Sequence, residues 1–279
     1  MPDAHAIDRL FARRNFLNAC VALTGGALIA AAGRARSEPT TAGPPDPALI
    51  EDLVAANHIL FDQGVVDGYG HVSVRHDKSP DRYLLSRSLA PELVTAADIV
   101  EFDLDSNAVD PRGRAFYLER FIHGEVYKAR PDVKSVVHHH SPAVIPFGVT
   151  KVPLQPVFHM AAFVGEGVPV FEIRDFGGMT NMLVSNPQLG AALARTLGNK
   201  PTVLMRGHGA VVVGNSLHQS VARSVYLQVD ARLQAQAMAL GGEITYLAPE
   251  EVKKFEDLGG AGYERAWELW KRKAMAEMR

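Results

Sequence analysis

Segments typical of β-strands alternate with segments typical of helices along residues 48–279, without an internal repeat or an interrupting linker. Short apolar runs such as residues 203–205 predict buried strands, whereas residues 216–240 have the length of a helix and end at a pair of glycines. Elements mixed in this order bury their apolar surfaces by packing helices against a sheet. The sequence therefore predicts one α/β domain, which at this length can bury a sizeable core.

The boundaries of these segments are set by capping residues and by proline. Asp46 and Pro47 are typical of an N-cap and a first helical residue, and they begin a helix expected to reach Gln63. Pro131 ends another expected helix shortly before a strand, so this helix and this strand are expected to pack together. The expected helices lie at 47–63, 115–130, 186–197 and 216–240, with two more near the C-terminus, and the expected strands at 72–74, 82–86, 99–104, 134–140, 168–173, 203–205, 210–213 and 244–247.

The N-terminal residues have the features of an export signal. Arg13 and Arg14 precede a Phe-Leu pair and an uncharged run that ends in small residues at Ala32. We expect a twin-arginine-type signal peptide over residues 1–37, a Pro-rich linker over 38–47 and the folded domain over 48–279. The uncharged run is marginal in length for a membrane span, so we expect no stable membrane anchor after cleavage. This predicts a periplasmic protein.

Charge and cysteine content narrow the function. The formal net charge is −2, so no general basic field indicates nucleic-acid binding, and no nucleic-acid partner is expected. The one cysteine, Cys20, lies inside the expected signal, which excludes an internal disulfide framework and a cysteine-built zinc or iron–sulfur site. A bound metal would take its ligands from His, Asp and Glu, and the chain has 11 histidines.

Three consecutive histidines follow an apolar pair at Val136 and Val137. Side chains alternate between the faces of a strand, so His138 and His140 are expected on one face and His139 on the other. Two imidazoles on one face of a strand can bind one ion without bending the backbone. A lone His-x-His is also compatible with a polar strand end that binds nothing.

Two further residues strengthen the metal interpretation. His208 lies between two glycines at a tight turn joining two apolar strands, where the backbone can approach closely. Glu119 lies on the expected helix that packs against the histidine strand. Three neutral imidazoles and one carboxylate are typical of a catalytic metal site. A cupin uses a similar ligand set, but it needs a nearly all-β chain. His123, four residues after Glu119, is either a support for the site or a histidine on the helix surface.

The order of these motifs resembles the class II aldolase/adducin family, which includes fuculose phosphate aldolase and ribulose phosphate 4-epimerase. The motifs are, in chain order, Tyr69-Gly70-His71-Val72-Ser73-Val74-Arg75, Glu119-x-x-x-His123, Tyr127-x-x-Arg130-Pro131-Asp132, Val136-Val137-His138-x-His140-Ser141 and Gly207-His208-Gly209. The similarity covers roughly residues 49–247.

The resemblance implies a three-layer α/β/α sandwich around a mixed, largely antiparallel sheet. It also implies a homo-oligomer, commonly a tetramer, that acts on a small-molecule substrate. His138, His140 and His208 match the metal ligands of the family, and Glu119 matches its acid/base carboxylate. One divalent ion per subunit is expected, with zinc favoured by three imidazoles and manganese or iron as alternatives.

The resemblance weakens where the aldolases bind the substrate phosphate. His71 stands in place of the asparagine of the turn, and Tyr117 and Leu118 replace a pair of serines. A phosphate site needs small residues and free backbone N–H groups, so a different substrate group is expected. Arg87 is either a carboxylate-binding residue or a surface loop arginine. The expected substrate-binding residues are Gly70, His71, Arg87 and Ser88.

The segments 70–75, 86–91 and 204–209 look more like the decarboxylase branch of the family, which acts on hydroxylated aromatic or pyridine carboxylates. The sequence therefore predicts a metal-dependent carbon–carbon lyase, in the first place a decarboxylase of such a compound. A class II aldolase or epimerase acting on a sugar phosphate or another hydroxy-carbonyl compound is the first alternative. A metal-dependent oxygenase on the same scaffold is the second.

Overall fold

A seven-stranded sheet forms the centre of the computed structural model, which describes residues 40–258 and 263–277. The strand order is β3-β2-β1-β4-β7-β6-β5, and every neighbouring pair is antiparallel except β5 and β6. This confirms the expected mixed, largely antiparallel sheet. The strands are β1 (His71–Arg75), β2 (Arg82–Ser86), β3 (Ile99–Asp103), β4 (Ser135–His139), β5 (Val170–Phe171), β6 (Thr202–Met205) and β7 (Gly209–Gly214).

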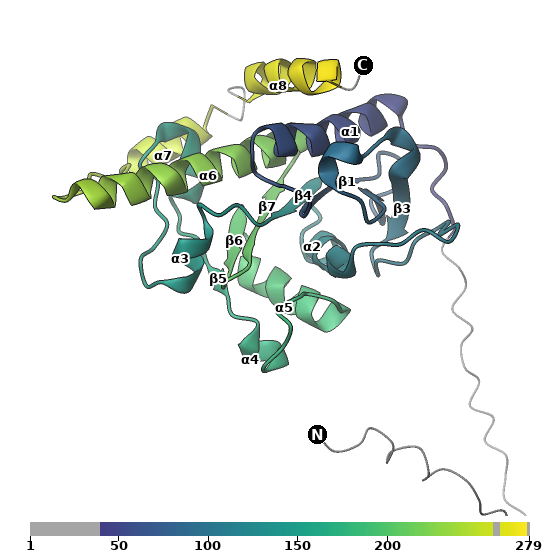
Figure 1. Cartoon of the computed structure of the whole chain (residues 1–279), viewed down its shortest axis with the longest axis horizontal. Coiled ribbons are helices and arrows are strands. Elements are labelled where there is room, and N and C mark those ends of the chain that lie inside the picture. The colour runs from purple at the N-terminus through teal and green to yellow at the C-terminus, as the bar shows by residue number, and fades with distance from the viewer. Residues whose placement is uncertain (1–39, 259–262, 278–279) are drawn as a thin grey trace, which may run out of the picture. The chain divides into compact units, whose positions relative to one another are not determined.

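Helices cover both faces of the sheet, as the α/β/α expectation requires (Figure 1). On one face, α1 (Pro47–Asp62) and α6 (Leu217–Leu240) bury an apolar cluster against Val72 and Val137. On the other, α2 (Phe121–Ala129) and α5 (Pro187–Leu197) bury a second cluster. The remaining helices are α3 (Ile145–Val149), α4 (Arg174–Gly177), α7 (Pro249–Glu256), α8 (Glu264–Glu277), and the 3-10 turns η1 (Pro91–Leu93), η2 (Ala96–Asp98), η3 (Leu118–Arg120) and η4 (His159–Val164).

Local side-chain chemistry sets several helix ends. The Asp46 carboxylate accepts a hydrogen bond from the Ala48 amide, and Pro47 is the first residue of α1, as the sequence predicts. The Ser216 hydroxyl caps α6 in the same way by accepting from the Gln219 amide. Among the helices of the described residues, none is long and apolar enough to cross a membrane.

Three expected elements differ from the structure. The helix expected over 115–130 begins later, with η3 and then α2, because Tyr117 bonds back to Leu89 and Ser86 and holds the preceding residues extended. The strand expected over 168–173 is reduced to β5, an edge strand that follows a proline. Residues 244–247 form no strand. They lie in the connection between α6 and α7, where the Leu247 amide bonds to the carbonyl of Pro156, a residue before η4.

The expected signal peptide over residues 1–37 lies outside the described residues. The described part of the segment expected to be a linker, residues 40–46, is bonded to the sheet. The Thr41 hydroxyl and the Ala42 amide both donate to the Glu101 carboxylate on β3. The folded part of the chain thus begins before α1.

Candidate metal centre

Strand pairing brings His71 and His138 to the same face of the sheet. His71 on β1 lies directly opposite His138 on β4. His138 and His140 project toward the α2 face, whereas His139 is completely buried on the opposite face, where its Nδ1 accepts from the Ser141 amide. The alternation predicted from the sequence is therefore present, with His140 one residue beyond the end of β4.

The glycines around His208 allow the β6–β7 turn to reach the same place. Gly207 has a φ of +63°, in the left-handed region that favours glycine. A side chain at Gly209 would be impossible without movement, because a Cβ there would lie 2.0 Å from the carbonyl oxygen of His139. This close approach of β7 to β4 places the His208 imidazole beside that of His140.

Glu119 reaches the histidines from η3, just before α2. Its backbone is kinked there, at φ −91° and ψ 15°. Its Oε1 accepts a hydrogen bond from the Val184 amide at 2.9 Å. Its Oε2 lies 3.3 Å from Nε2 of His138 and 3.4 Å from Nε2 of His208. One carboxylate oxygen is therefore fixed by the backbone, and the other faces the imidazoles.

The four side chains form a compact set of ligand atoms, all within 4.8 Å of one another. Nε2 of His140 lies 3.0 Å from Nε2 of both His138 and His208. Tetrahedral zinc with Zn–N bonds of ~2.0–2.1 Å holds its nitrogen ligands about 3.3 Å apart. The two spacings from His140 are close to that value.

Backbone carbonyls fix the tautomers of two of these histidines. Nδ1 of His138 donates to the Ala210 carbonyl and Nδ1 of His208 donates to the Met182 carbonyl, each at 3.1 Å. Their Nε2 atoms therefore carry lone pairs, and His140 can donate a proton to only one of them at a time. Lone pairs that face each other in this way are stabilised by a shared cation. The residues present fit a divalent metal ion.

The charges of Glu119 and His140 agree with that assignment, whereas burial lowers the pKa of His208 but Glu119 beside it raises it above the usual value. Burial raises the pKa of Glu119, but His138 and His208 beside it lower the pKa by more than burial raises it. The pKa therefore lies well below its usual range, and the carboxylate stays ionised. Burial, with His138 and His208 nearby, lowers the pKa of His140 to about 4. A neutral imidazole and an ionised carboxylate are the protonation states that bind metals.

A cavity of about 450 Å³ opens over Glu119 and His140. Its other lining residues are mostly apolar or aromatic and comprise Gly68, Tyr69, Gly70, His71, Ser88, Leu89, Ala90, Phe116, Tyr117, Leu118 and Leu183. Three of the expected substrate-binding residues, Gly70, His71 and Ser88, thus share the pocket with the metal cluster. Arg87 does not line it; its Nε lies 2.6 Å from Oδ1 of Asp98, in an ion pair.

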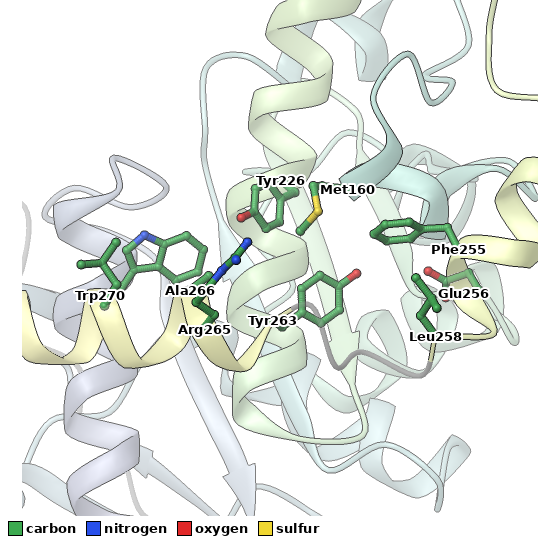
Figure 2. Close-up of a pocket in the computed structure, with 10 residues that line it drawn as sticks. Met160, Tyr226, Phe255, Glu256, Leu258, Tyr263, Arg265, Ala266 and Trp270 are labelled. Atoms are coloured by element: carbon green, nitrogen blue, oxygen red, sulfur yellow. The ribbon is translucent and has the colours of Figure 1, made fainter.

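A larger cavity, of about 570 Å³, lies between α6 and the C-terminal segments (Figure 2). Aromatic side chains such as Tyr226, Tyr263 and Trp270 line it. None of its lining residues is a histidine, so it offers no comparable set of metal ligands. Size alone would therefore select the wrong cavity for metal chemistry.

Several groups that support the site have no signal in the sequence. The Val184 amide and the Met182 and Ala210 carbonyls are backbone atoms, which any residue supplies. The sequence alone does not decide whether His123 supports the site or lies on the helix surface. The structure buries it completely, with its Nε2 2.6 Å from Nδ1 of His71.

Residues 51–235 match the family model described as Class II Aldolase and Adducin N-terminal domain. The chain is 36% identical over 246 residues to the decarboxylase tropJ of Talaromyces stipitatus, over 80% of this chain and 92% of that protein. It is 30% identical over 233 residues to 3,4-dihydroxyphthalate decarboxylase of Arthrobacter keyseri, over 78% and 90%. Its fold is similar to that of L-fuculose 1-phosphate aldolase from Glaciozyma antarctica, with a TM-score of 0.67, 24% identity, and 84% and 94% of the chains covered. The chain therefore belongs to the class II aldolase and adducin family, and like these relatives it is an enzyme.

Proposed function

We propose that the protein is a metal-dependent carbon–carbon lyase that removes a carboxyl group from a hydroxylated aromatic or heteroaromatic carboxylate. The observation that carries the proposal is the position of the Glu119–histidine cluster beside a pocket with aromatic and apolar walls. The similarity to two decarboxylases at 30–36% identity supports the same reaction class. One of these relatives is named for 3,4-dihydroxyphthalate, a substrate of this chemical type.

His138, His140 and His208 would hold one divalent ion per subunit through their Nε2 atoms. We propose zinc, because three imidazoles suit it, with manganese and iron as the alternatives. Such an ion supplies Lewis-acid stabilisation of negative charge on a phenolic oxygen and a neighbouring carboxylate.

The walls of the pocket would orient the ring and exclude water from it. Phe116, Tyr117 and Leu89 present flat or apolar surfaces to the space above the cluster. An aromatic ring packs well against such walls, and the excluded water strengthens the polar contacts at the base of the site.

We assign the proton transfer to Glu119. When the bond between the ring carbon and the carboxyl group breaks, carbon dioxide leaves and the electron pair remains on the ring. A water molecule bonded to the ionised Oε2 of Glu119 gives up a proton, which this oxygen passes to the ring carbon to form the new C–H bond, and hydroxide is left. The Val184 amide holds Oε1 in place, so Oε2 keeps its orientation toward the site.

The pocket is poorly suited to a sugar phosphate. Tyr117 and Leu118 precede Glu119, and the Tyr117 hydroxyl is already bonded to Leu89 and Ser86. A phosphate would need several free N–H groups or small hydroxyls here. We therefore rank aldol cleavage or epimerisation of a sugar phosphate below decarboxylation.

The test is a substrate panel with the purified protein loaded with zinc or with manganese. The panel contains ortho-hydroxy aromatic acids, including 3,4-dihydroxyphthalate, and L-fuculose 1-phosphate. We expect carbon dioxide from at least one aromatic acid and no aldehyde from the sugar phosphate. The matched variant Glu119→Gln keeps the three imidazoles and should lose ~10²–10⁴-fold in rate. Aldehyde release without carbon dioxide would replace the proposal with the aldolase alternative.

We further propose that the protein is exported to the periplasm by its twin-arginine-type signal and acts as a homotetramer. The paired arginines at the N-terminus support export. Oligomers are common in the family to which the chain belongs, which supports the tetramer.

A further inference from the structure

A chain of four buried polar side chains runs from the pocket into the layer between the sheet and α2. Nδ1 of His71 lies 2.6 Å from Nε2 of His123, and Nδ1 of His123 lies 2.6 Å from the Ser73 hydroxyl oxygen. The Ser73 oxygen lies 2.8 Å from the Tyr127 hydroxyl. All four residues are at most 4% exposed, so water cannot replace these hydrogen bonds. His71 and Ser73 come from β1, and His123 and Tyr127 from α2.

Only one direction of donation along these hydrogen bonds gives every hydroxyl and imidazole hydrogen an acceptor. The Tyr127 hydroxyl must donate to Ser73, because its other neighbour, the Val136 amide, is itself a donor. The Ser73 hydroxyl is then left to donate to Nδ1 of His123. A neutral His123 carries its proton on Nε2 and donates it to Nδ1 of His71. The reverse direction would leave the Tyr127 hydrogen buried without an acceptor, which is unfavourable.

The same hydrogen bonds make both imidazoles neutral. Nδ1 of His123 accepts from the Ser73 hydroxyl, and Nδ1 of His71 accepts from Nε2 of His123. A ring nitrogen that accepts carries no proton, so neither imidazole is protonated on both nitrogens. A neutral His71 that accepts at Nδ1 must carry its one proton on Nε2.

The free end of the chain reaches the pocket. Nε2 of His71 has no hydrogen-bond partner among the described residues. It is also absent from the buried unpaired polar atoms of those residues, so it is accessible from the pocket. His71 lines the cavity beside Glu119, and its ring centroid lies 4.5 Å from that of Tyr117. A proton on Nε2 is therefore available to a molecule in the pocket.

We propose that Tyr127, Ser73 and His123 fix His71 as the tautomer protonated on Nε2, so that His71 donates a hydrogen bond to an oxygen of the bound substrate. His71 is then a catalytic residue, and the other three are positioning residues. A donor already oriented toward the substrate stabilises negative charge that develops on that oxygen. The tautomer stands on the hydrogen bonds alone, whereas the role toward an aromatic carboxylate rests on the proposed function.

The tautomer can be measured without turnover. The full chain, with ¹⁵N-labelled histidine and loaded with zinc, is examined by ¹⁵N NMR, and the His71 signals are identified by their absence in His71→Gln. We expect an unprotonated Nδ1 and a protonated Nε2 for His71. A proton on Nδ1 would overturn the proposal, whatever the protein does with a substrate.

A matched pair of serine variants tests the positioning role. Ser73→Ala removes the donor to His123. Ser135→Ala removes a buried hydroxyl from the neighbouring strand on the opposite face of the sheet, where it bonds to Ser220 and to the backbone carbonyl of Ser73 but not to the Ser73 side chain. In Ser73→Ala we expect mixed His71 tautomers and a fall of roughly 10–100-fold in kcat on 3,4-dihydroxyphthalate with little change in KM. Ser135→Ala should keep the single tautomer and the kcat.

Unmixed tautomers and an unchanged kcat in Ser73→Ala would contradict the positioning role. If the wild-type protein releases no carbon dioxide at all, the proposed function fails. In that case, the NMR comparison of Ser73→Ala with Ser135→Ala still shows whether the hydrogen bond from Ser73 fixes the His71 tautomer.

Discussion

His138 and His139 are neighbours in the sequence, yet the sheet gives them different surroundings. Nε2 of His138 faces Glu119 and His140. His139 lies on the other face, fully buried, and its Nε2 has no hydrogen-bond partner among the described residues. A shift of one residue along a strand thus separates a metal-ligand position from a core position.

This difference makes a prediction for alanine variants of the two residues. His138→Ala should lose the bound metal, because it removes one of three imidazole ligands. His139→Ala should keep the metal but unfold more easily, by about 1–3 kcal/mol, because it leaves a cavity in the core. Metal content per chain and thermal unfolding of both variants check this. A wild-type metal content in His138→Ala would remove the metal centre from the account.

Residue types and spacing predict the ligand set but not its support. The His-x-His pair, the glycines around His208 and the position of Glu119 are visible in the sequence. The tautomers of His138 and His208 depend on the carbonyls of Ala210 and Met182, which have no side-chain signal. Arg87 was expected to bind substrate, but it forms an ion pair with Asp98. No local pattern predicts this ion pair, because Asp98 is eleven positions away.

At the scale of elements, α8 is attached to the folded core through apolar and polar contacts, with Trp267 and Ala274 buried in the apolar cluster that α1 and α6 also form. Lys271 on α8 lies 2.7 Å from carboxylate oxygens of both Glu51 and Asp52 on α1. His218 on α6 stacks on Trp267 of α8, with ring centroids 4.1 Å apart. These contacts join the C-terminal helix to the layer that covers one face of the sheet.

The attachment of α8 is expected to depend on pH through His218. Burial lowers the pKa of His218, but Asp52 and Glu264 raise it above the usual value of 6.5. The charged imidazole therefore stabilises the contact fully below pH 6.5, and this contribution is lost as the pH rises through the raised pKa. Hydrogen exchange of residues 264–277 should accelerate over that range by more than the intrinsic base-catalysed rate does in the wild type.

The matched variant His218→Gln separates this effect from other titrations. Asp52 has a lowered pKa and Lys271 a raised one, so both keep their charge over the same range. The pH dependence of exchange relative to the intrinsic base-catalysed rate should therefore largely disappear in His218→Gln. The same acceleration in variant and wild type would show that another group controls α8.

Element boundaries were predicted best where a capping residue marks them. Asp46 and Ser216 begin α1 and α6 as expected. The start of the helix before the histidine strand was misplaced, because Tyr117 is held by contacts with residues about thirty positions away. Residues 244–247 were expected to form a strand, but the Leu247 amide and the Tyr246 hydroxyl bond to Pro156 and Gln234 in other segments. Local periodicity carries no information about such distant partners.

At the scale of the whole molecule, the order of strands and helices together with five motifs was enough to predict the architecture. The α/β/α layering and the family membership are confirmed. The strand order itself, with β1 and β4 adjacent, was not predicted from the sequence. The subunit assembly and the cellular location stay predictions.

The location can be tested through the paired arginines. Replacing Arg13 and Arg14 together by lysine keeps the charge but removes the planar guanidinium groups, so export should stop. The matched control replaces Arg34 and Arg36 by lysine and should be exported normally. Both are measured as the fraction of full-length and cleaved protein in the periplasm. Equal export of the two double variants would contradict a twin-arginine signal.

The central claim is that the Glu119–histidine cluster carries out decarboxylation with a bound metal ion. The most direct measurement is the rate of carbon dioxide release from 3,4-dihydroxyphthalate by the same preparation before chelation, after removal of metal, and after reloading. The account predicts that the rate falls with metal content and returns when about one ion per chain is restored. Full activity in the metal-free protein would contradict it.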